Sequence, residues 1–350
     1  MFDRIYNLFS RDVGIDLGTA TTLVYVSGKG IIINEPSIVA LNKKTDQVVA
    51  IGNEAKKMIG RTPAHISVIR PLVEGVISDF EVTEEMLTYF IRKVHEDVWQ
   101  GFVRPRVVIG VPSGITNVEI RAVRDAAKNA GAREVHIVEE PMAAAIGVRL
   151  PVHDPVGNVV IDIGGGTSDI AVISLGGIVV SKNMRIAGDK FDQDIVDYVR
   201  DEFKILIGES TAEAIKLAIG SVSKSGEGLE TVARGRDLVS GLPREVIITD
   251  TDIREAIIKS VRSLVRATKE VIEETPPELI SDIMHRGIVM VGGGSFLRNL
   301  ANMFESEIKV PVHIPDDPLT AVVRGAGIII EDLEKYKDIL IKHDDELPPK

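Results

Sequence analysis

Short apolar runs alternate along the chain with longer segments in which apolar residues recur every three or four positions. The runs "VGIDL" (13–17) and "RVVIGVP" (106–112) predict buried strands. Segment 81–98 instead places Met86, Leu87 and Phe90 on one face of an amphipathic helix. Alternating strands and helices indicate an α/β fold. Further strands are predicted at 21–26, 30–41, 134–138, 159–175 (a hairpin), 229–249 (a hairpin) and 287–295 (running into a glycine loop), and further helices at 117–132, 141–148, 189–206, 211–220, 252–274 and 318–335.

The second half of the chain repeats the pattern of the first. "VGIDLGTATTLVYV" (13–26) and "VVIDIGGGTSDIAVISL" (159–175) are each a strand, an aspartate, a glycine turn, a threonine and a second strand. "VVIGVPSG" (107–114) and "IVMVGGGS" (288–295) each lead from a strand into a glycine loop. Two similar halves predict two lobes that face each other across a cleft.

Composition narrows the class of protein. The chain has 350 residues, 44% of them apolar, and a formal net charge of −11, which argues against broad nucleic-acid binding. It contains no cysteine, so disulfides and thiol nucleophiles are excluded. An apolar run long enough for a membrane span and the features of a signal peptide are both missing from the sequence, which predicts a cytoplasmic location.

Three glycine-rich turns, each following a buried strand, are the candidates for chemistry: Gly18-Thr19, Gly164–Gly166 and Gly292–Gly294. Glycine supplies the positive φ of a tight turn, and it also lets backbone N–H groups approach an anion. Asp16 and Asp162 stand beside the first two turns. Each carboxylate could cap its own turn, but beside phosphate it requires a cation, and Mg²⁺ needs only one or two carboxylates. The matched pair of aspartates favours a magnesium–polyphosphate site.

Other common sites are not indicated. The sequence has neither GxxxxGK[ST] nor GxGxxG, the fingerprints of P-loop and Rossmann nucleotide sites. "GVPSG" does not match GxSxG, so Ser113 is a poor nucleophile candidate. The histidines lack HExxH spacing, and zinc is not expected.

Four motifs resemble those of the superfamily of actin, sugar kinases and heat-shock-70 ATPases. "DLGTATT" (16–22) and "DIGGGTSD" (162–169) are similar to its two phosphate turns, "EEPMAAAIG" (139–147) to its connecting helix and "VGGGS" (291–295) to its adenosine loop. "NEPSIVAL" and "IRPLVEGVISDFEVTEEML" resemble the bacterial actins of rod-shaped cells. The resemblance covers nearly the whole chain.

The resemblance implies a two-lobed actin-like ATPase fold, each lobe a mixed sheet flanked by helices, with the nucleotide in the cleft. Lobe I is expected at 1–147 plus about 316–350, with a small subdomain at about 33–65. Lobe II is expected at 148–315, with a small subdomain at about 182–248.

The resemblance also implies ATP and Mg²⁺ as cofactors and assigns residues to them. Glu140 matches the acid that orients the attacking water, with Asp162 and Thr167 beside it in catalysis, while Glu139 remains an alternative for the water role. Asp16 and Asp162 are expected at Mg²⁺, through water. Glu213 and Lys216 match ribose and base contacts, but at one helical turn apart they also fit a surface ion pair. The nucleotide contacts are expected at Asp16, Gly18, Thr19, Ala20, Thr21, Gly164, Gly165, Gly166, Glu213, Lys216, Gly292, Gly293, Gly294 and Ser295.

The implied function is a slow, Mg-dependent ATPase that polymerises. Its expected partners are other copies of itself, the inner face of the cytoplasmic membrane and membrane proteins of the cell elongation machinery, and its role is to organise peptidoglycan synthesis and maintain rod shape. A small-molecule kinase or a chaperone-type ATPase of the same superfamily is the alternative.

Two segments are candidate membrane contacts. In "MFDRIYNLFSR" the apolar residues share one helical face, which favours a short interfacial helix over a tail whose aromatic residues pack on the domain. "VWQGFV" (98–103) is an apolar loop that could insert into a membrane or fold over the core. The candidate membrane residues are Met1, Phe2, Ile5, Phe9, Trp99 and Phe102.

Overall fold

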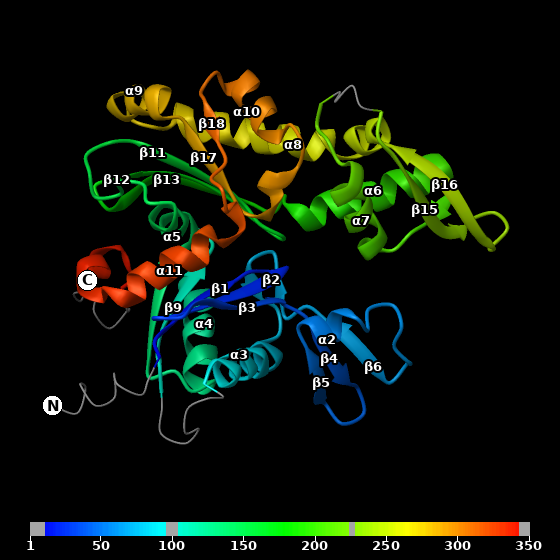
Figure 1. Ribbon diagram of the computed structural model, residues 1–350, viewed down its shortest axis with the longest axis horizontal. Coiled ribbons are helices and arrows are strands. Elements are labelled where there is room, and N and C mark those ends of the chain that lie inside the picture. Colours follow the sequence, from blue (N-terminus) through cyan, green and yellow to red (C-terminus); the bar gives the residue numbers. More distant parts are fainter. Residues whose placement is uncertain (1–10, 96–103, 224–227, 343–350) are drawn as a thin grey trace. The chain divides into compact units, whose positions relative to one another are not determined.

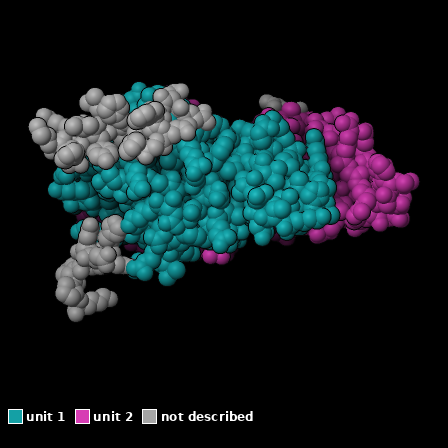
Figure 2. Space-filling model, turned by 90° about the horizontal axis from the view of Figure 1, so that it is seen from below, with its two compact units in different colours: residues 1–156, 173–181, 319–350 teal, residues 157–172, 182–318 magenta. Residues whose placement is uncertain are grey.

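The computed structural model describes residues 11–95, 104–223 and 228–342. The chain divides into two compact units, coloured separately in Figure 2: unit 1 comprises residues 1–156, 173–181 and 319–350, and unit 2 comprises 157–172 and 182–318. The expected lobe boundaries stay a prediction. The six candidate membrane residues, Met1, Phe2, Ile5, Phe9, Trp99 and Phe102, lie outside the described residues.

Unit 1 is built on a mixed five-stranded sheet in the order β10-β9-β1-β2-β3 (Figure 1). β1, β9 and β10 run parallel, while β1, β2 and β3 form an antiparallel meander. The carboxyl ends of β1, β9 and β10 therefore lie at one edge of the sheet. The strands are β1 (Val13–Leu17), β2 (Thr21–Val26), β3 (Gly30–Pro36), β9 (Arg106–Val111) and β10 (Glu134–Glu139).

Helices cover both faces of this sheet. On one face Ile15, Ile109 and Ile137 join a core with apolar residues of α3 (Phe80–Val94) and α4 (Asn117–Asn129). The other face presents Gly14 and Gly110. A Cβ at either position would come closer to α11 than ordinary van der Waals contact allows. Glycine at these two positions lets α11 (Ala321–Glu331) and its neighbour α5 (Glu140–Gly147) pack close to the strands.

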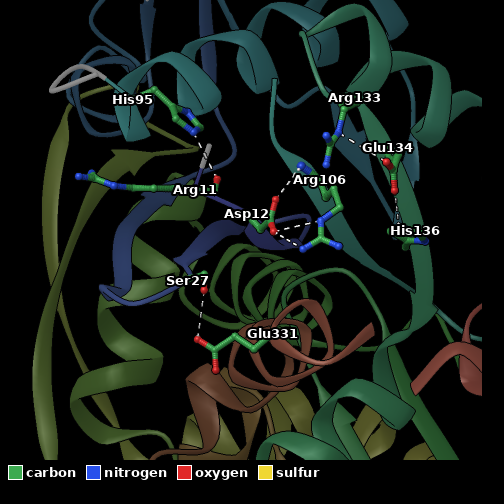
Figure 3. Close-up of polar contacts among 9 residues, drawn as sticks. All are labelled: Arg11, Asp12, Ser27, His95, Arg106, Arg133, Glu134, His136 and Glu331. Carbon is green, nitrogen blue, oxygen red and sulfur yellow. Dashed lines mark hydrogen bonds and ion pairs between the residues drawn. The ribbon is translucent and has the colours of Figure 1, made fainter. Parts of the chain in front are cut away.

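The amino ends of the parallel strands are fixed by ion pairs (Figure 3). Arg106 donates from Nε and Nη2 to Asp12 Oδ2 at 3.0 and 2.5 Å, and its backbone N–H donates to Asp12 Oδ1. Because the guanidinium engages one carboxylate with two donors, the start of β1 is held to the start of β9. Glu134 lies between Arg133 and His136 at the start of β10.

A small sheet extends from this core. The segment 30–41, predicted as further strand, forms β3 and β4, which belong to two different sheets. Pro36 has no N–H for a ladder, and the backbone of Ser37 bonds Ala20 as β3 ends. The elements are β4 (Val39–Asn42), β5 (Gln47–Ile51), α2 (Asn53–Lys56) and β6 (Ile66–Ile69), followed by the hairpin β7 (Leu72–Val73) and β8 (Val76–Ile77).

Unit 2 contains most of a second five-stranded sheet, in the order β13-β12-β11-β17-β18. The tip of its β12–β13 hairpin, 173–181, is grouped with unit 1. A three-stranded sheet, β14-β15-β16, follows. The elements are β11 (Asn158–Ile163), β12 (Ser168–Ser174), β13 (Gly177–Met184), α6 (Gly188–Phe203), β14 (Ile205–Leu206), α7 (Glu209–Ile219), β15 (Glu230–Asp237), β16 (Pro243–Thr249), α8 (Asp250–Glu273), α9 (Pro277–Arg286), β17 (Ile288–Val291), η1 (Gly293–Phe296), α10 (Leu300–Ile308) and β18 (Val312–His313).

The last predicted helix, 318–335, is also broken. It consists of η2 (Pro318–Thr320), α11, α12 (Leu333–Tyr336) and η3 (Lys337–Ile339). Asp332 leaves helical conformation at φ −139°, and its side chain caps α12 by accepting from Lys335 N–H. Across the described part of the chain, no helix is both long and apolar enough to span a bilayer.

Candidate functional site

Three parallel strands of unit 1 bring the predicted chemistry to one edge. β1 leads into the Gly18 turn, β9 into Ser113-Gly114, and β10 into Glu139 and Glu140. The strand register aligns Asp16 with Gly110, and Gly110 with Val138. Ligands of α/β sheets bind beyond the carboxyl ends of the strands, so this edge is the candidate site of unit 1.

Glu140 lies against β9. It is the first residue of α5, is only 9% exposed, and its Cγ lies 3.4 Å from where a Cβ at Gly110 would stand. Gly110 is the register partner of Asp16, so its missing side chain leaves room for Glu140 on the sheet face that Asp16 shares. The structure therefore places Glu140 over the strand next to Asp16, although the two acids are far apart in the sequence.

Glu139 takes a different direction. The Ser113 side chain and the Gly114 backbone lie beside its carboxylate. Burial raises the pKa of Glu139 above its ordinary value, and these two groups oppose the rise. Of the two adjacent acids, Glu139 is engaged with the loop after β9, whereas Glu140 extends over β9.

The surroundings of Asp16 disfavour the charged form of its carboxylate. Burial raises the pKa of Asp16 to about 7, because the ionised form loses its hydration. A divalent cation nearby would favour the charged form again. Within the described residues, no group of three or more potential metal ligands occurs.

In the first glycine turn, one residue binds two backbone carbonyl groups on the same side of the turn. Ser37 donates from its hydroxyl to the Gly18 carbonyl at 2.5 Å and from its backbone N–H to the Ala20 carbonyl at 3.1 Å. In a trans peptide the N–H points opposite to the carbonyl. The N–H groups of Thr19 and Thr21 therefore point away from Ser37. The Thr19 hydroxyl accepts from the Gly75 N–H at 3.0 Å, which leaves its own proton for another acceptor.

The second glycine turn, in unit 2, is held in the same manner. The backbone N–H of Gly188 donates to the Gly164 carbonyl at 3.2 Å, and that of Asp189 to the Gly165 carbonyl at 2.8 Å. Both donors belong to the first turn of α6, where N–H groups lack partners within the helix. By the same peptide geometry, the N–H groups of Gly165 and Gly166 point away from α6.

The third glycine segment packs directly on the strand that carries Asp162. β11 and β17 are parallel, with Asp162 aligned to Val291. A Cβ at Gly292 would overlap the Asp162 carboxylate, and one at Gly294 would overlap the Ile163 side chain. Gly292 also has φ +79°, a conformation that favours glycine. The Ser295 hydroxyl donates to the Gly292 carbonyl at 2.6 Å, so Gly292, Gly293, Gly294 and Ser295 form one compact loop beside Asp162.

Lys216 on α7 makes an ion pair with α6. Its Nζ lies 2.9 Å from the Asp192 carboxylate and donates to the Gly188 carbonyl at 3.0 Å. Burial raises the pKa of Asp192 to about 6, and Lys216 opposes the rise. The amine thus anchors the end of α6 that holds the second glycine turn. The predicted contacts of Glu213 and Lys216 with a nucleotide stay predictions.

The sequence did not indicate several residues that surround the candidate residues of each unit. In unit 1 Ser37 holds the first turn and Ser113 lies beside Glu139, and in unit 2 Asp192 pairs with Lys216. The only signal for Ser37 was its place in "NEPSIVAL", a segment noted for its resemblance and not for chemistry.

Known proteins match the chain over nearly its full length. A family model described as MreB/Mbl protein matches residues 10–338. Cell shape-determining protein Mbl of Bacillus subtilis is 48% identical over 94% of this chain and 98% of that protein. Cell shape-determining protein MreB of Escherichia coli is 48% identical over 96% of this chain and 98% of that protein.

A solved structure agrees with the fold. The crystal structure of MreB5 of Spiroplasma citri bound to ADP has a TM-score of 0.89 and 39% sequence identity, covering 94% of this chain and 98% of that chain. The predicted α/β fold, with two mixed sheets flanked by helices, is confirmed.

Proposed function

The chain belongs to the MreB/Mbl protein family, and from this membership we propose that it is a bacterial actin that binds and hydrolyses ATP and assembles into filaments that determine cell shape. The names of its relatives support the role in cell shape, and the bound ADP of the Spiroplasma protein supports nucleotide binding. A small-molecule kinase or a chaperone-type ATPase is not favoured, because the relatives that match the whole chain are cell-shape proteins.

The observation that carries the proposal is the common construction of the two glycine turns. In each, fixed donors hold two carbonyl groups on one side: Ser37 in the first turn, the start of α6 in the second. Successive N–H groups that face the same way form a nest for anions. Both turns therefore offer backbone donors to the phosphate groups of ATP, and neither needs a lysine for this purpose.

Asp16 and Asp162 would hold the hydrated Mg²⁺ that accompanies ATP and neutralises phosphate charge. Each is the penultimate residue of a buried strand that leads into a glycine turn, and Asp162 is 7% exposed. Side chains that act on a metal through its water ligands orient those waters by hydrogen bonds. In this role the two carboxylates keep their charge, which the buried position of Asp16 otherwise opposes.

Glu140 orients the attacking water in this proposal. Its carboxylate is at the start of α5, where the helix dipole favours negative charge, and it lies on the same sheet face as Asp16. Phosphoryl transfer needs little more from a protein than positioning and charge stabilisation. Thr167, buried at the end of the second turn, and Thr19 supply hydroxyl donors beside the backbone N–H groups.

Filaments would arise from a head-to-tail contact between copies that does not close into a ring. ATP would favour the assembled conformation and hydrolysis would weaken it. We place the filament at the inner face of the cytoplasmic membrane, held by residues 1–10 and the loop 98–103, where it recruits membrane proteins of the elongation machinery and organises peptidoglycan synthesis. Many weak contacts along one filament add up to firm attachment.

Replacing Asp162 with Asn tests the magnesium role. Asn keeps the size that fits against Gly292 but removes the charge, so we expect ATP turnover at fixed Mg²⁺ to fall by about 10–100-fold. The Mg²⁺ concentration needed for half-maximal turnover should rise. Asp201→Asn is the control, because Asp201 is exposed and pairs with Arg200. If a magnesium titration of Asp162→Asn overlays that of the unchanged protein, Asp162 has no part in binding the metal.

A further inference from the structure

We propose that Ser37 is a positioning residue for phosphate binding: it fixes the orientation of the first glycine turn and ties that turn to the small sheet β4-β5-β6. The inference rests on the proposed ATP function and goes beyond it, because Ser37 belongs to none of the motifs that suggested a nucleotide. Ser37 is fully buried, at 0% exposure, in the two-residue break between β3 and β4.

The hydroxyl of Ser37 has a defined direction. It bonds both the Gly18 carbonyl, at 2.5 Å, and the Thr22 hydroxyl, at 2.8 Å. A carbonyl cannot donate, so the single proton of Ser37 goes to Gly18. Thr22 must then donate its proton to Ser37 Oγ. The three groups form a chain of two hydrogen bonds that reinforce each other, running from Thr22 through Ser37 to Gly18.

The backbone of Ser37 completes the arrangement. Its N–H donates to the Ala20 carbonyl at 3.1 Å, so one residue holds the carbonyls on both sides of Thr19. Each fixed carbonyl also fixes the N–H group of the residue that follows it, because the peptide unit that joins them is planar and trans. Ser37 thereby sets the direction of the N–H donors of Thr19 and Thr21 without contacting the phosphate itself.

The same residue is the covalent link to the small sheet. Ile38 follows it, packs in a separate apolar cluster with Ala40 and Ala55, and accepts a hydrogen bond from the Gly52 N–H at 2.9 Å. A displacement of the Gly18–Thr21 turn would therefore be passed to the start of β4 through one buried residue.

Comparing ligands with and without phosphate groups distinguishes a positioning role of Ser37 from a purely structural one. Adenosine has no phosphate and does not use the turn, whereas ADP and ATP do. We expect Ser37→Ala to weaken ADP and ATP binding by about tenfold, the equivalent of one lost hydrogen bond in placing the donors, while adenosine affinity stays within about twofold. Isothermal titration calorimetry with the three ligands in the presence of Mg²⁺ measures this directly.

A second variant of Ser37 and a control variant at another buried hydroxyl complete the test. Ser37→Cys is nearly the same size but donates weakly, so its loss of ADP affinity should fall between those of the unchanged protein and Ser37→Ala. It decides the question if the Ala variant does not fold. Thr268→Val is the matched control: it removes a buried hydroxyl that bonds the Leu264 carbonyl inside α8, and it should leave all three affinities unchanged.

Each outcome has a clear meaning. Equal losses for ADP and adenosine, or no loss in either Ser37 variant, would overturn the positioning role and leave the proposed ATP function intact. If the unchanged protein binds neither ADP nor ATP while its thermal unfolding is cooperative, the proposed function fails, and the role of Ser37 fails with it.

Discussion

Replacing Glu140 with Ala should lower the rate of ATP hydrolysis by about a hundredfold or more and leave ATP affinity nearly unchanged. Glu140 lies over Gly110 on the sheet face that carries Asp16, and in the proposed mechanism it orients the attacking water and does not hold the nucleotide. Removing a group that acts only on the attacking water lowers kcat and spares binding. Single-turnover hydrolysis and equilibrium ATP binding, measured on the same preparation, check both halves of this expectation.

Glu139→Ala is the matched control for Glu140→Ala. The two acids are neighbours, but Glu139 lies beside Ser113 and Gly114, in the loop after β9. Its loss should change the hydrolysis rate by less than about tenfold. If the Glu139 variant loses turnover and the Glu140 variant keeps it, the assignment of the water-orienting acid is reversed.

A methyl group at position 292 should be among the most damaging single changes in unit 2. A Cβ there would overlap the Asp162 carboxylate and the Ile163 carbonyl oxygen, and would lie 2.7 Å from the Ile163 carbonyl carbon. The backbone at φ +79° adds strain for any residue with a side chain. We expect Gly292→Ala to lower the free energy of unfolding by about 3 kcal/mol or more. Urea denaturation followed by circular dichroism measures the change.

Comparison with Gly241→Ala isolates the steric part of the effect at Gly292. Gly241 has φ +74°, nearly the same backbone conformation, but a Cβ there meets no atom within 4 Å. Its cost should be limited to backbone strain, about 1 kcal/mol. Similar losses of stability for the two variants would mean that the Gly292 loop does not pack against Asp162 as described.

Local patterns predicted the frame of the candidate site well. The strands at 13–17 and 21–26 have the predicted bounds, because an apolar run that ends in a glycine turn leaves little freedom in register. The aspartates before the turns lie where the parallel strands end, as the pattern indicated. Met86, Leu87 and Phe90 are fully buried on the predicted face of α3.

The remaining features depend on contacts that no local pattern encodes. The segment 30–41 is divided between two sheets, and the hydrogen bond from Ser37 at this break goes to a turn earlier in the chain. The difference between Glu139 and Glu140 depends on Gly110 and Ser113, which belong to another strand and its loop. Lys216 pairs with a residue on α6 and so could not be matched to its partner by helical spacing.

The short elements of unit 1 were also missed. α2 has four residues and β7 and β8 have two each, too few for a helical or strand period to appear in the sequence. Their conformations depend on the chain around them: the β7–β8 turn at Glu74-Gly75 has positive φ at both residues and donates to Thr19.

Sedimentation of the purified protein with and without Mg-ATP tests the filament assignment most directly. We expect ATP to move most of the protein into a high-speed pellet, with filaments visible by negative-stain electron microscopy, and EDTA to return it to the supernatant. Glu140→Ala should pellet at least as completely, because it binds ATP and hydrolyses it slowly. Anionic liposomes should increase pelleting, and less so for a chain that lacks residues 1–10. Protein that stays in the supernatant while ATP is demonstrably bound would contradict the assignment as a filament-forming actin.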